Sequence, residues 1–236
     1  MDFDGARVLV VGATGVIGGA LAGELAARGA QVALAGRDTR RLAERSGELG
    51  GRPTRECDAY DLDGCGALAT WARQELSGLD AVVCATGVAA FGPADELPDE
   101  VAEHLMAVNA LAPMAVLRGA LPLLPSGGAV AAITGVLVDR PQPGMAAYSA
   151  AKCALSAWLT AVRGEQRKRK VAVVDARLPH LETGFAGRAV AGQPPAMPAA
   201  ARLDAAVAGI VEAVGTGAAL VLPGDDGGVR IEARAR

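Results

Sequence analysis

Short apolar runs alternate with longer amphipathic stretches along most of the chain. RVLVV, at residues 7–11, is a β-branched run that stops at a glycine, and QVALA, at residues 31–35, follows a stretch with apolar residues at helical spacing. Apolar runs without polar alternation are typical of strands that are buried on both faces. The pattern predicts strands at residues 7–11, 31–35, 54–57, 81–84, 129–133, 171–175 and 219–222, and helices at residues 17–28, 39–49, 66–76, 99–121, 146–163 and 203–214.

This alternation of strand and helix predicts an α/β fold in which helices cover both faces of a parallel sheet. Right-handed crossovers make such a sheet doubly wound, so we expect a Rossmann fold with about seven strands. Pro113 lies inside one predicted helix and should kink or split it. The charged tail after Pro223 is expected to be exposed or frayed.

The chain is long enough for one domain, residues 1–236. Of its 236 residues 51% are hydrophobic, which suffices for a single α/β domain with a full core. Residues 182–202 break the alternation, because they hold three prolines and show no clear period. A long irregular loop after a strand often closes over a ligand, so we expect a substrate lid there. A surface insertion is the alternative.

Charge and composition exclude several classes of protein. The formal net charge of −3 argues against a nucleic-acid surface, which needs clustered Lys and Arg. The first residues lack the basic region of a signal peptide, and no apolar stretch approaches the ~18–20 residues of a spanning helix. We therefore expect a soluble cytoplasmic protein with no membrane partner. The four cysteines show no CxxC pair and no zinc spacing, so reduced thiols and no metal are expected.

Three glycines after the first predicted strand indicate a site for a dinucleotide. Gly12, Gly15 and Gly18 lie between this strand and the first predicted helix. Gly12 allows the tight turn, Gly15 lets the backbone approach a pyrophosphate, and Gly18 lets the helix pack on the sheet. Backbone N–H groups at the helix start then bind the phosphates. A plain strand–helix turn is the alternative.

The end of the second predicted strand favours NADP(H) over NAD(H). It lacks the acidic residue that would bind the ribose 2′-hydroxyl of NAD(H). Arg37 follows instead, and a guanidinium suits a 2′-phosphate through paired charge-assisted hydrogen bonds. Arg40 and Arg41 lie near enough in the sequence to assist. Alternatively, Arg37 is a surface residue paired with Asp38 or Glu44.

Tyr148 and Lys152, in the segment YSAAK, lie four residues apart. On a helix this spacing places both side chains on one face. A nearby ammonium lowers the pKa of a phenol, so the pair could transfer protons. An ordinary helix surface is the alternative.

With this YSAAK segment after the fifth predicted strand and the glycine loop near the N-terminus, the chain resembles the short-chain dehydrogenase/reductase family from about residue 7 to residue 222. The resemblance implies a tyrosine that acts as general acid/base and a lysine that lowers its pKa and binds the nicotinamide ribose. It also implies an asparagine, matched by Asn109, that supports a proton-relay water. Homodimers or homotetramers are common in the family, built on the long helices before and after the fifth strand.

The resemblance further implies contacts with the cofactor. Asp58 matches an aspartate that contacts the adenine, Pro179 borders the nicotinamide, and Thr183 matches a threonine that often contacts the carboxamide. The glycine pattern departs from the usual one, since Gly15 serves where the family has a glycine at the position of Val16. The implied cofactor-binding residues are Gly12, Thr14, Gly15, Val16, Ile17, Gly18, Arg37, Asp58, Ala85, Gly87, Tyr148, Lys152, Pro179 and Thr183.

One family residue is missing. The serine that holds the substrate carbonyl lies thirteen positions before the tyrosine, and that position is Gly135. Thr134 beside it cannot simply replace the serine, because adjacent strand residues face opposite sides. Three alternatives follow. Thr134 swings in as the donor; a backbone N–H near Gly135, or His180, polarises the carbonyl; or the chemistry is not carbonyl reduction.

The sequence therefore predicts an NADP(H)-dependent enzyme that reduces a carbonyl, or oxidises an alcohol, of a small to medium organic substrate. Its candidate catalytic residues are Tyr148, Lys152, Asn109 and Thr134. Two alternatives use the same fold: non-redox biosynthetic chemistry, such as a dehydration, isomerisation or cyclisation, and a catalytically weak protein that only binds the cofactor.

Overall fold

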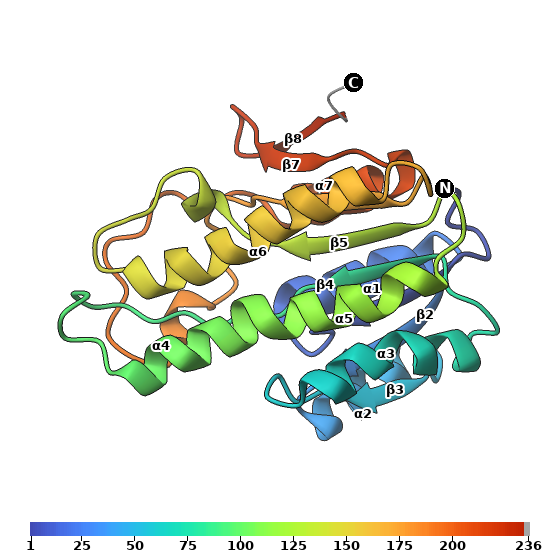
Figure 1. Ribbon diagram of the computed structural model, residues 1–236, viewed down its shortest axis with the longest axis horizontal. Helices are drawn as coiled ribbons and strands as arrows, with labels where there is room; N and C mark the ends of the chain where they lie inside the picture. Colours follow the sequence, from blue (N-terminus) through green and yellow to red (C-terminus); the bar gives the residue numbers. More distant parts are fainter. Residues whose placement is uncertain (234–236) are drawn as a thin grey trace.

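A single sheet forms the centre of the molecule (Figure 1). The computed structural model describes residues 1–233, and in these residues the strand order is β3-β2-β1-β4-β5-β6-β7-β8. All neighbouring strands are parallel except β7 and β8. The strands are β1 (Arg7–Val11), β2 (Gln31–Gly36), β3 (Thr54–Glu56), β4 (Ala81–Cys84), β5 (Ala129–Ile133), β6 (Ala172–Ala176), β7 (Leu220–Pro223) and β8 (Val229–Glu232). The doubly wound Rossmann fold is thus confirmed.

Helices cover both faces of this sheet. They are α1 (Val16–Ala27), α2 (Thr39–Glu48), α3 (Leu62–Glu75), α4 (Asp99–Met106), α5 (Ala112–Ala120), α6 (Ala146–Glu165) and α7 (Leu203–Thr216). Val8 and Val10 of β1 pack into a cluster with α1 and α7, whereas Leu9 and Val11 pack into a second cluster with α3, α5 and α6. Both faces of β1 are therefore buried, which explains why its sequence shows no polar alternation.

Small residues let two helices on one face approach closely. A Cβ added at Gly119 of α5 would lie 2.1 Å from the carbonyl oxygen of Gly66 in α3. A backbone contact this close excludes every residue with a side chain. The abundance of glycine and alanine in the chain thus has a direct use in helix packing.

The eighth strand differs from the prediction. The segment after Pro223 was expected to be frayed, but Val229–Glu232 forms β8 and pairs antiparallel with β7. Val229 and Ile231 are half buried, whereas Arg230 between them is exposed. This alternation spans only four residues and carries two charges, so it gave too weak a signal in the sequence.

Pro113 breaks the long predicted helix as expected. Residues 99–121 form α4, then the π-helical turn η1 (Ala107–Leu111), then α5. A proline has no N–H, so the regular i→i−4 ladder cannot run through Pro113. π-Helical turns inside α-helices frequently occur at functional sites, and Asn109 lies in this one.

The helical stretch Asp99–Leu123 is 25 residues long and apolar enough to span a membrane by length and composition alone. The expectation that no apolar stretch reaches this length is therefore wrong. In this fold 67% of its most apolar window is buried. A core helix of a globular protein has the same property, so the stretch is weak support for a membrane span.

Candidate active site

A cleft of about 1640 Å³ opens beyond the carboxyl ends of the strands. The β4–α4, β5–α6 and β6–α7 loops project from this end of the sheet, on the left in Figure 1. The strand order reverses between β1 and β4, which is where doubly wound sheets bind ligands. The cleft is lined by most of the predicted cofactor residues, namely Gly12, Thr14, Gly15, Val16, Ile17, Arg37, Ala85, Gly87, Tyr148, Lys152, Pro179 and Thr183.

The glycine loop has the geometry of a phosphate cradle. Gly12 has a φ of 85°, and a Cβ there would lie 2.8 Å from the backbone of Ala85. A Cβ at Gly18 would lie 2.1 Å from the carbonyl oxygen of Gly12, so Gly18 packs behind the loop and does not line the cleft. Gly15 is the N-cap of α1 and has no side chain to cap it. The first N–H groups of α1 can therefore serve an anion.

The basic residues after β2 divide into paired and unpaired ones. Arg40 pairs with Glu44 at 2.6 Å, and Asp38 caps α2 by accepting from the backbone N–H of Arg41. Arg37 and Arg41 both line the cleft, and neither guanidinium has an ion pair among the described residues. The alternative pairing of Arg37 with Asp38 or Glu44 is absent from the described part of the chain, so this end of the cleft has two guanidinium groups available for an anion.

Asp58, predicted to contact the adenine, lies in an exposed turn after β3. Its side chain is exposed, and it accepts a hydrogen bond from the backbone N–H of Tyr60 at 3.0 Å. Cys57 and Ala59 on either side line the cleft, but Asp58 does not. The carboxylate is used in a local turn of the kind that Asp favours.

Tyr148 and Lys152 lie on one face of α6 and are both buried, with 8% and 3% of their surfaces exposed. The Lys152 Nζ donates to the carbonyl oxygen of Ile133 at 2.9 Å and lies 6.0 Å from the centre of the Tyr148 ring. Burial lowers the pKa of Lys152 to about 8, against the opposing effect of the negative charge of Asp175. Burial also raises the pKa of the Tyr148 phenol. Without a cofactor, burial and not the ammonium therefore dominates the acidity of the phenol.

The Tyr148 hydroxyl has no hydrogen-bond partner among the described residues. Its ring packs in an apolar cluster with Ala89, Phe91 and Met145, and Phe185 lies against it with ring centres 6.4 Å apart. The phenol is thus held by packing, while its hydroxyl is available to a ligand in the cleft.

The side chain of Asn109 is engaged with the β4–α4 loop. Its Oδ1 accepts from the N–H of Val88 at 3.1 Å, and its Nδ2 donates to the carbonyl of Val88 at 3.0 Å. Pro113, four residues later, has no N–H to give to the Asn109 carbonyl. That carbonyl therefore lacks its regular helical donor and can accept a hydrogen bond from elsewhere, for example from a water molecule.

The hydroxyl of Thr134, predicted as a substitute donor, is bonded to another residue in this structure. Its side chain is buried, and its Oγ1 donates to the carboxylate of Asp175. The nearby N–H groups are also used: those of Thr134 and Gly135 donate to Ala176, and that of Val136 donates to Leu178. These groups are therefore already engaged, whereas Leu137 in the same turn has an N–H without a partner among the described residues and lines the cleft, as does His180.

Gly135 itself has a backbone that the family's serine would not share. Its φ is 94°, a conformation that residues with side chains rarely adopt. An added Cβ would meet only the carbonyl oxygen of Leu178, at 3.7 Å. The backbone at this position therefore suits a glycine better than a serine.

His180 lines the cleft, with its Nε2 3.8 Å from Glu182 at the start of the irregular loop. This loop crosses the cleft and is fastened to the β4–α4 loop by two backbone bonds, Val190 N–H to Ala89 and Phe91 N–H to Ala191. The loop carries Phe185, which sequence reasoning missed because a single aromatic in an irregular segment has no pattern. It missed Asp175 too, although one acidic residue inside the apolar strand VAVVDA was a visible signal.

Comparison with known proteins shows the family of the chain. Residues 6–193 match the model of a family described as short chain dehydrogenase. The vibriobactin-specific 2,3-dihydro-2,3-dihydroxybenzoate dehydrogenase of Vibrio cholerae is 29% identical over 163 residues, a match that covers 66% of this chain but only 62% of that protein.

Two solved structures are similar to the whole fold. A dehydrogenase/reductase from Sinorhizobium meliloti 1021 is 28% identical with a TM-score of 0.73, over 78% of this chain and 76% of that one. A short chain dehydrogenase from Burkholderia cenocepacia J2315, in complex with NADP, has a TM-score of 0.81 at 24% identity, over 91% and 92% of the two chains. At that identity the second similarity concerns the fold alone.

Proposed function

Because the chain belongs to the short-chain dehydrogenase/reductase family, we propose that it is an NADP(H)-dependent oxidoreductase that reduces a carbonyl, or oxidises the corresponding alcohol, of a small to medium apolar substrate. One observation carries the proposal: the Tyr148 hydroxyl has no protein partner among the described residues, and its ring centre lies 6.0 Å from the buried ammonium of Lys152, in the cleft beyond the strands.

The residues of the cleft fit a phosphorylated dinucleotide. Gly12 and Gly15 leave backbone N–H groups and no side chains at the start of α1, where a pyrophosphate would bind. Arg37 and Arg41 would bind a 2′-phosphate, and Lys152 would bind the nicotinamide ribose. When bound, the cofactor supplies or accepts the hydride.

Residues of this protein then supply the proton that the substrate oxygen receives. Tyr148 gives its hydroxyl proton to the substrate oxygen and recovers one afterwards. Lys152, with a positive charge, stabilises the phenolate that is left behind. The Asn109 carbonyl, deprived of a donor by Pro113, holds the water that resupplies the proton. Positioned acid–base groups of this kind contribute about 10²–10⁴-fold to a rate.

The substrate oxygen has no serine hydroxyl as a second donor in this site. Thr134 and the N–H groups around Gly135 are already bonded within the described fold. Losing one polarising donor lowers a rate by about 10²–10³-fold. A slower enzyme, and not an inactive one, is therefore the expected result, since Tyr148 and Lys152 are retained.

The substrate binds beside an apolar wall. Val88, Ala89, Phe91, Leu137 and Met145 line the cleft near Tyr148. Residues 182–202 act as the lid; two backbone bonds between this segment and the β4–α4 loop, and the presence of Phe185 and residues 195–198 in the lining of the cleft, support this role. An uncharged substrate suits this wall, since a buried unpaired charge is costly.

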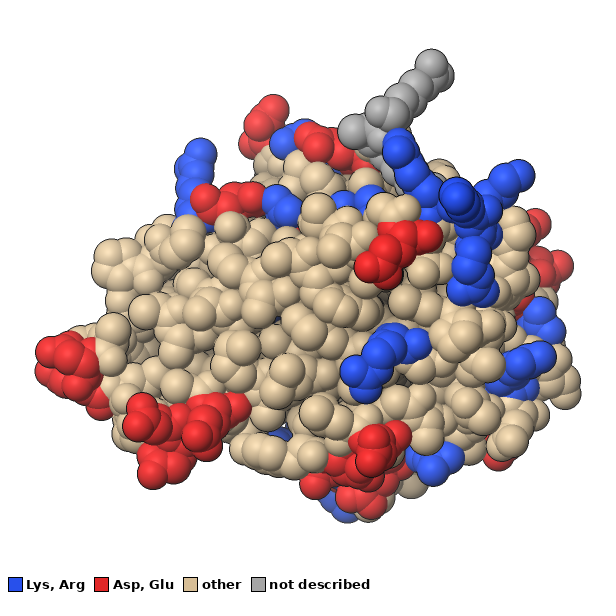
Figure 2. Space-filling model, viewed as in Figure 1, with Lys and Arg blue, Asp and Glu red and all other residues tan. Residues whose placement is uncertain are grey.

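The enzyme forms homo-oligomers through the face of α4, α5 and α6 and works as a soluble protein of the cytoplasm. Figure 2 shows this face with few charged residues near its centre. Leu111, the last residue of η1, is 44% exposed, and α6 presents the small side chains of Ala150 and Ala157 to solvent. These residues permit the close approach of a second copy.

Replacing the tyrosine hydroxyl tests the proposed reaction. Absorbance at the nicotinamide band is followed with NADPH and a panel of apolar aldehydes and ketones. Tyr148→Phe should lower turnover by about 10²–10⁴-fold and leave NADPH binding intact. The matched control is Tyr60→Phe at the other tyrosine, which is 64% exposed and bonded to His104. Full activity in Tyr148→Phe would refute the mechanism, and products without NADPH consumption would favour the non-redox alternative.

A further inference from the structure

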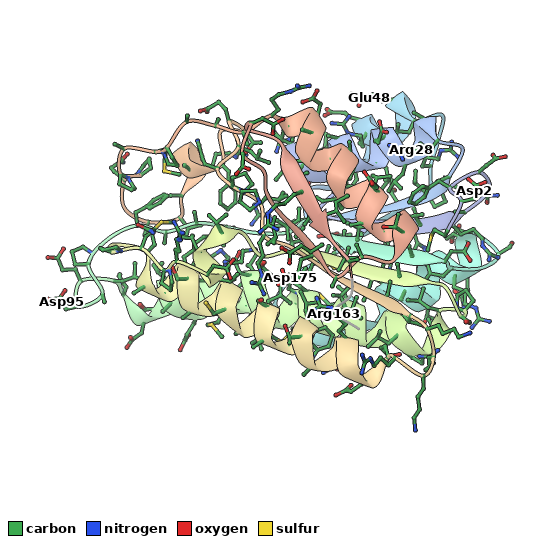
Figure 3. The ribbon with its side chains drawn as sticks, turned by 90° about the horizontal axis from the view of Figure 1, so that it is seen from above. Asp2, Arg28, Glu48, Asp95, Arg163 and Asp175 are labelled. Atoms are coloured by element: carbon green, nitrogen blue, oxygen red, sulfur yellow. The ribbon has the colours of Figure 1, made fainter. Side chains whose placement is uncertain are left out.

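A buried carboxylate lies directly behind the site and takes no part in the reaction described above. Asp175 of β6 is fully buried, and Figure 3 shows it inside the molecule, whereas Asp2, Glu48 and Asp95 lie at the edges. Desolvating a carboxylate is costly unless it is paired and hydrogen-bonded. Asp175 therefore needs partners in the interior.

Three partners satisfy this carboxylate. Thr134 Oγ1 donates to Oδ1, Ser156 Oγ donates to Oδ2 at 2.7 Å, and Arg177 Nε donates to Oδ2 at 2.9 Å. Arg177 also donates to Asp139 at 2.6 Å through Nη1 and to Ser156 at 3.2 Å through Nη2. The network is thus closed by charge-assisted bonds.

These partners surround the position of Lys152. Thr134 directly follows Ile133, whose carbonyl accepts from the Lys152 Nζ. Ser156 lies four residues after Lys152 on α6, one turn further along the same face. The carboxylate therefore ties together the strand end that binds the ammonium and the helix that carries it.

We propose that Asp175, supported by Arg177, is a positioning residue for Lys152: it fixes the Ile133–Gly135 turn that holds the ammonium, and its negative charge keeps that buried ammonium protonated. This proposal rests on the proposed function in one respect only, namely that Lys152 binds the nicotinamide ribose. The placement and charge of Lys152 can be measured without any cofactor.

The charges around Lys152 agree with this assignment. Among the described residues, Asp175 from β6 raises the pKa of Lys152 against the effect of burial, and the Cys84 thiol from β4 does so to a smaller extent. Tyr148 on α6 is the other titratable group nearby. Arg177 is bonded to Asp175 and offsets part of its charge. Removing Asp175 should therefore lower the pKa of Lys152, and removing Arg177 should raise it.

The chain offers a direct readout, because it contains only three lysines, Lys152, Lys168 and Lys170. Protein labelled with ¹³C at the lysine side chains is titrated by NMR, and Lys152→Met assigns the signal. In Asp175→Asn the Lys152 titration should move to lower pH by about half a unit or more. The signals of Lys168 and Lys170 should not differ between the proteins.

Two further variants separate charge from structure. Arg177→Gln should move the Lys152 titration to higher pH. If Asp175→Asn does not fold, this variant alone tests whether the charges of the network control the pKa of Lys152. Ser156→Ala removes a hydrogen bond to the same carboxylate without changing any charge, so it should leave the titration in place. An unchanged Lys152 titration in the folded charge variants overturns the proposal, as does a shift in Ser156→Ala equal to that in Asp175→Asn.

Cofactor binding completes the test. NADPH fluorescence should show that Asp175→Asn weakens NADPH binding more at pH 8 than at pH 6.5, because Lys152 loses its proton at a lower pH in this variant. Equal weakening at both pH values contradicts the role of the Asp175 charge. If the wild-type protein binds no NADPH, the proposed function fails, whereas the NMR titration still decides whether Asp175 controls Lys152.

Discussion

The ammonium of Lys152 donates to the carbonyl oxygen of Ile133 at 2.9 Å, from a side chain that is almost completely buried. One neutral carbonyl does not replace the water that a charged amine loses on burial. The fold therefore keeps a destabilising charge at the bottom of its cleft. Such a charge is useful only to a ligand that can pair with it.

Lys152→Met should make the protein without cofactor more stable. Burial lowers the pKa of Lys152 from 10.5 to about 8, and each unit corresponds to about 1.4 kcal/mol. After subtracting about 1 kcal/mol for the lost hydrogen bond, we expect the free energy of unfolding at pH 7 to rise by about 2 kcal/mol in urea titrations.

The same pKa shift fixes how the free energy of unfolding changes with pH. The folded-state pKa is below the unfolded one, so between about pH 8 and 10.5 the unfolded chain binds more protons. The stability of the wild type should therefore rise with pH through this window, and the advantage of Lys152→Met should fade. Lys168→Met, at an exposed position, is the control. A variant that is less stable than the wild type at pH 7 would contradict the argument.

Gly135→Ser should not restore a serine-type site. The residue has a φ of 94° and a ψ of 163°, a conformation that is almost restricted to glycine and costs a residue with a side chain about 1–3 kcal/mol. Space is not the obstacle, because the nearest atom to an added Cβ is 3.7 Å away. We expect thermal unfolding to show a loss of about 1–3 kcal/mol, with no gain in turnover.

Gly23→Ala provides the matched control for this backbone effect. Gly23 lies in the interior of α1, and an added Cβ meets nothing within 4 Å. Alanine in a helix is more favourable than glycine by about 0.5–1 kcal/mol, so the two substitutions should have opposite signs. A stabilised Gly135→Ser with increased activity would show that the turn readily adopts another conformation.

The arrangement of strands and helices was readable from the sequence because each buried strand is a continuous apolar run. The glycine loop and the Tyr148–Lys152 spacing could be recognised in the sequence because each depends on local geometry alone. The partner of Thr134 was not, since Asp175 is 41 residues away and only the pairing of β5 with β6 brings them together. β8 was missed for a similar reason, as its short polar strand is defined by its pairing with β7.

Arg37→Glu should exchange the preference between the two nicotinamide cofactors. A charge-assisted bond to a 2′-phosphate is worth about 1.5–3 kcal/mol, so the Kd for NADPH should rise by roughly 10–100-fold while that for NADH changes little. Isothermal titration calorimetry measures both. Arg40→Glu is the control, because Arg40 already pairs with Glu44. Equal effects of the two variants would mean that net charge, and not a specific contact, governs binding.

Gly18→Ala should displace the phosphate loop, because Gly18 packs against the side of the loop that faces away from the cleft. The new Cβ would lie 2.1 Å from the carbonyl oxygen of Gly12, so α1 must move away from the loop. Overpacking of this kind costs about 1–3 kcal/mol. We expect a lower melting temperature and weaker binding of both NADPH and NADH. Unchanged melting would show that the loop and helix are not tightly coupled.

Leu111→Glu should dissociate the oligomer. Leu111 lies at the junction of η1 and α5, where it exposes an apolar side chain on a face with few charges. A carboxylate there would be buried without a partner in any dimer built on α5 and α6. Size-exclusion chromatography with light scattering should show an assembly for the wild type and a chain of 23.7 kDa for the variant. Leu62→Glu, at an exposed leucine on α3, is the control and should stay assembled.

The same variant tests whether the interface supports the active site, because Asn109 and Leu111 share the same π-helical turn. If the interface holds this turn in place, dissociation should also lower turnover. An active monomer would show that the turn is rigid by itself.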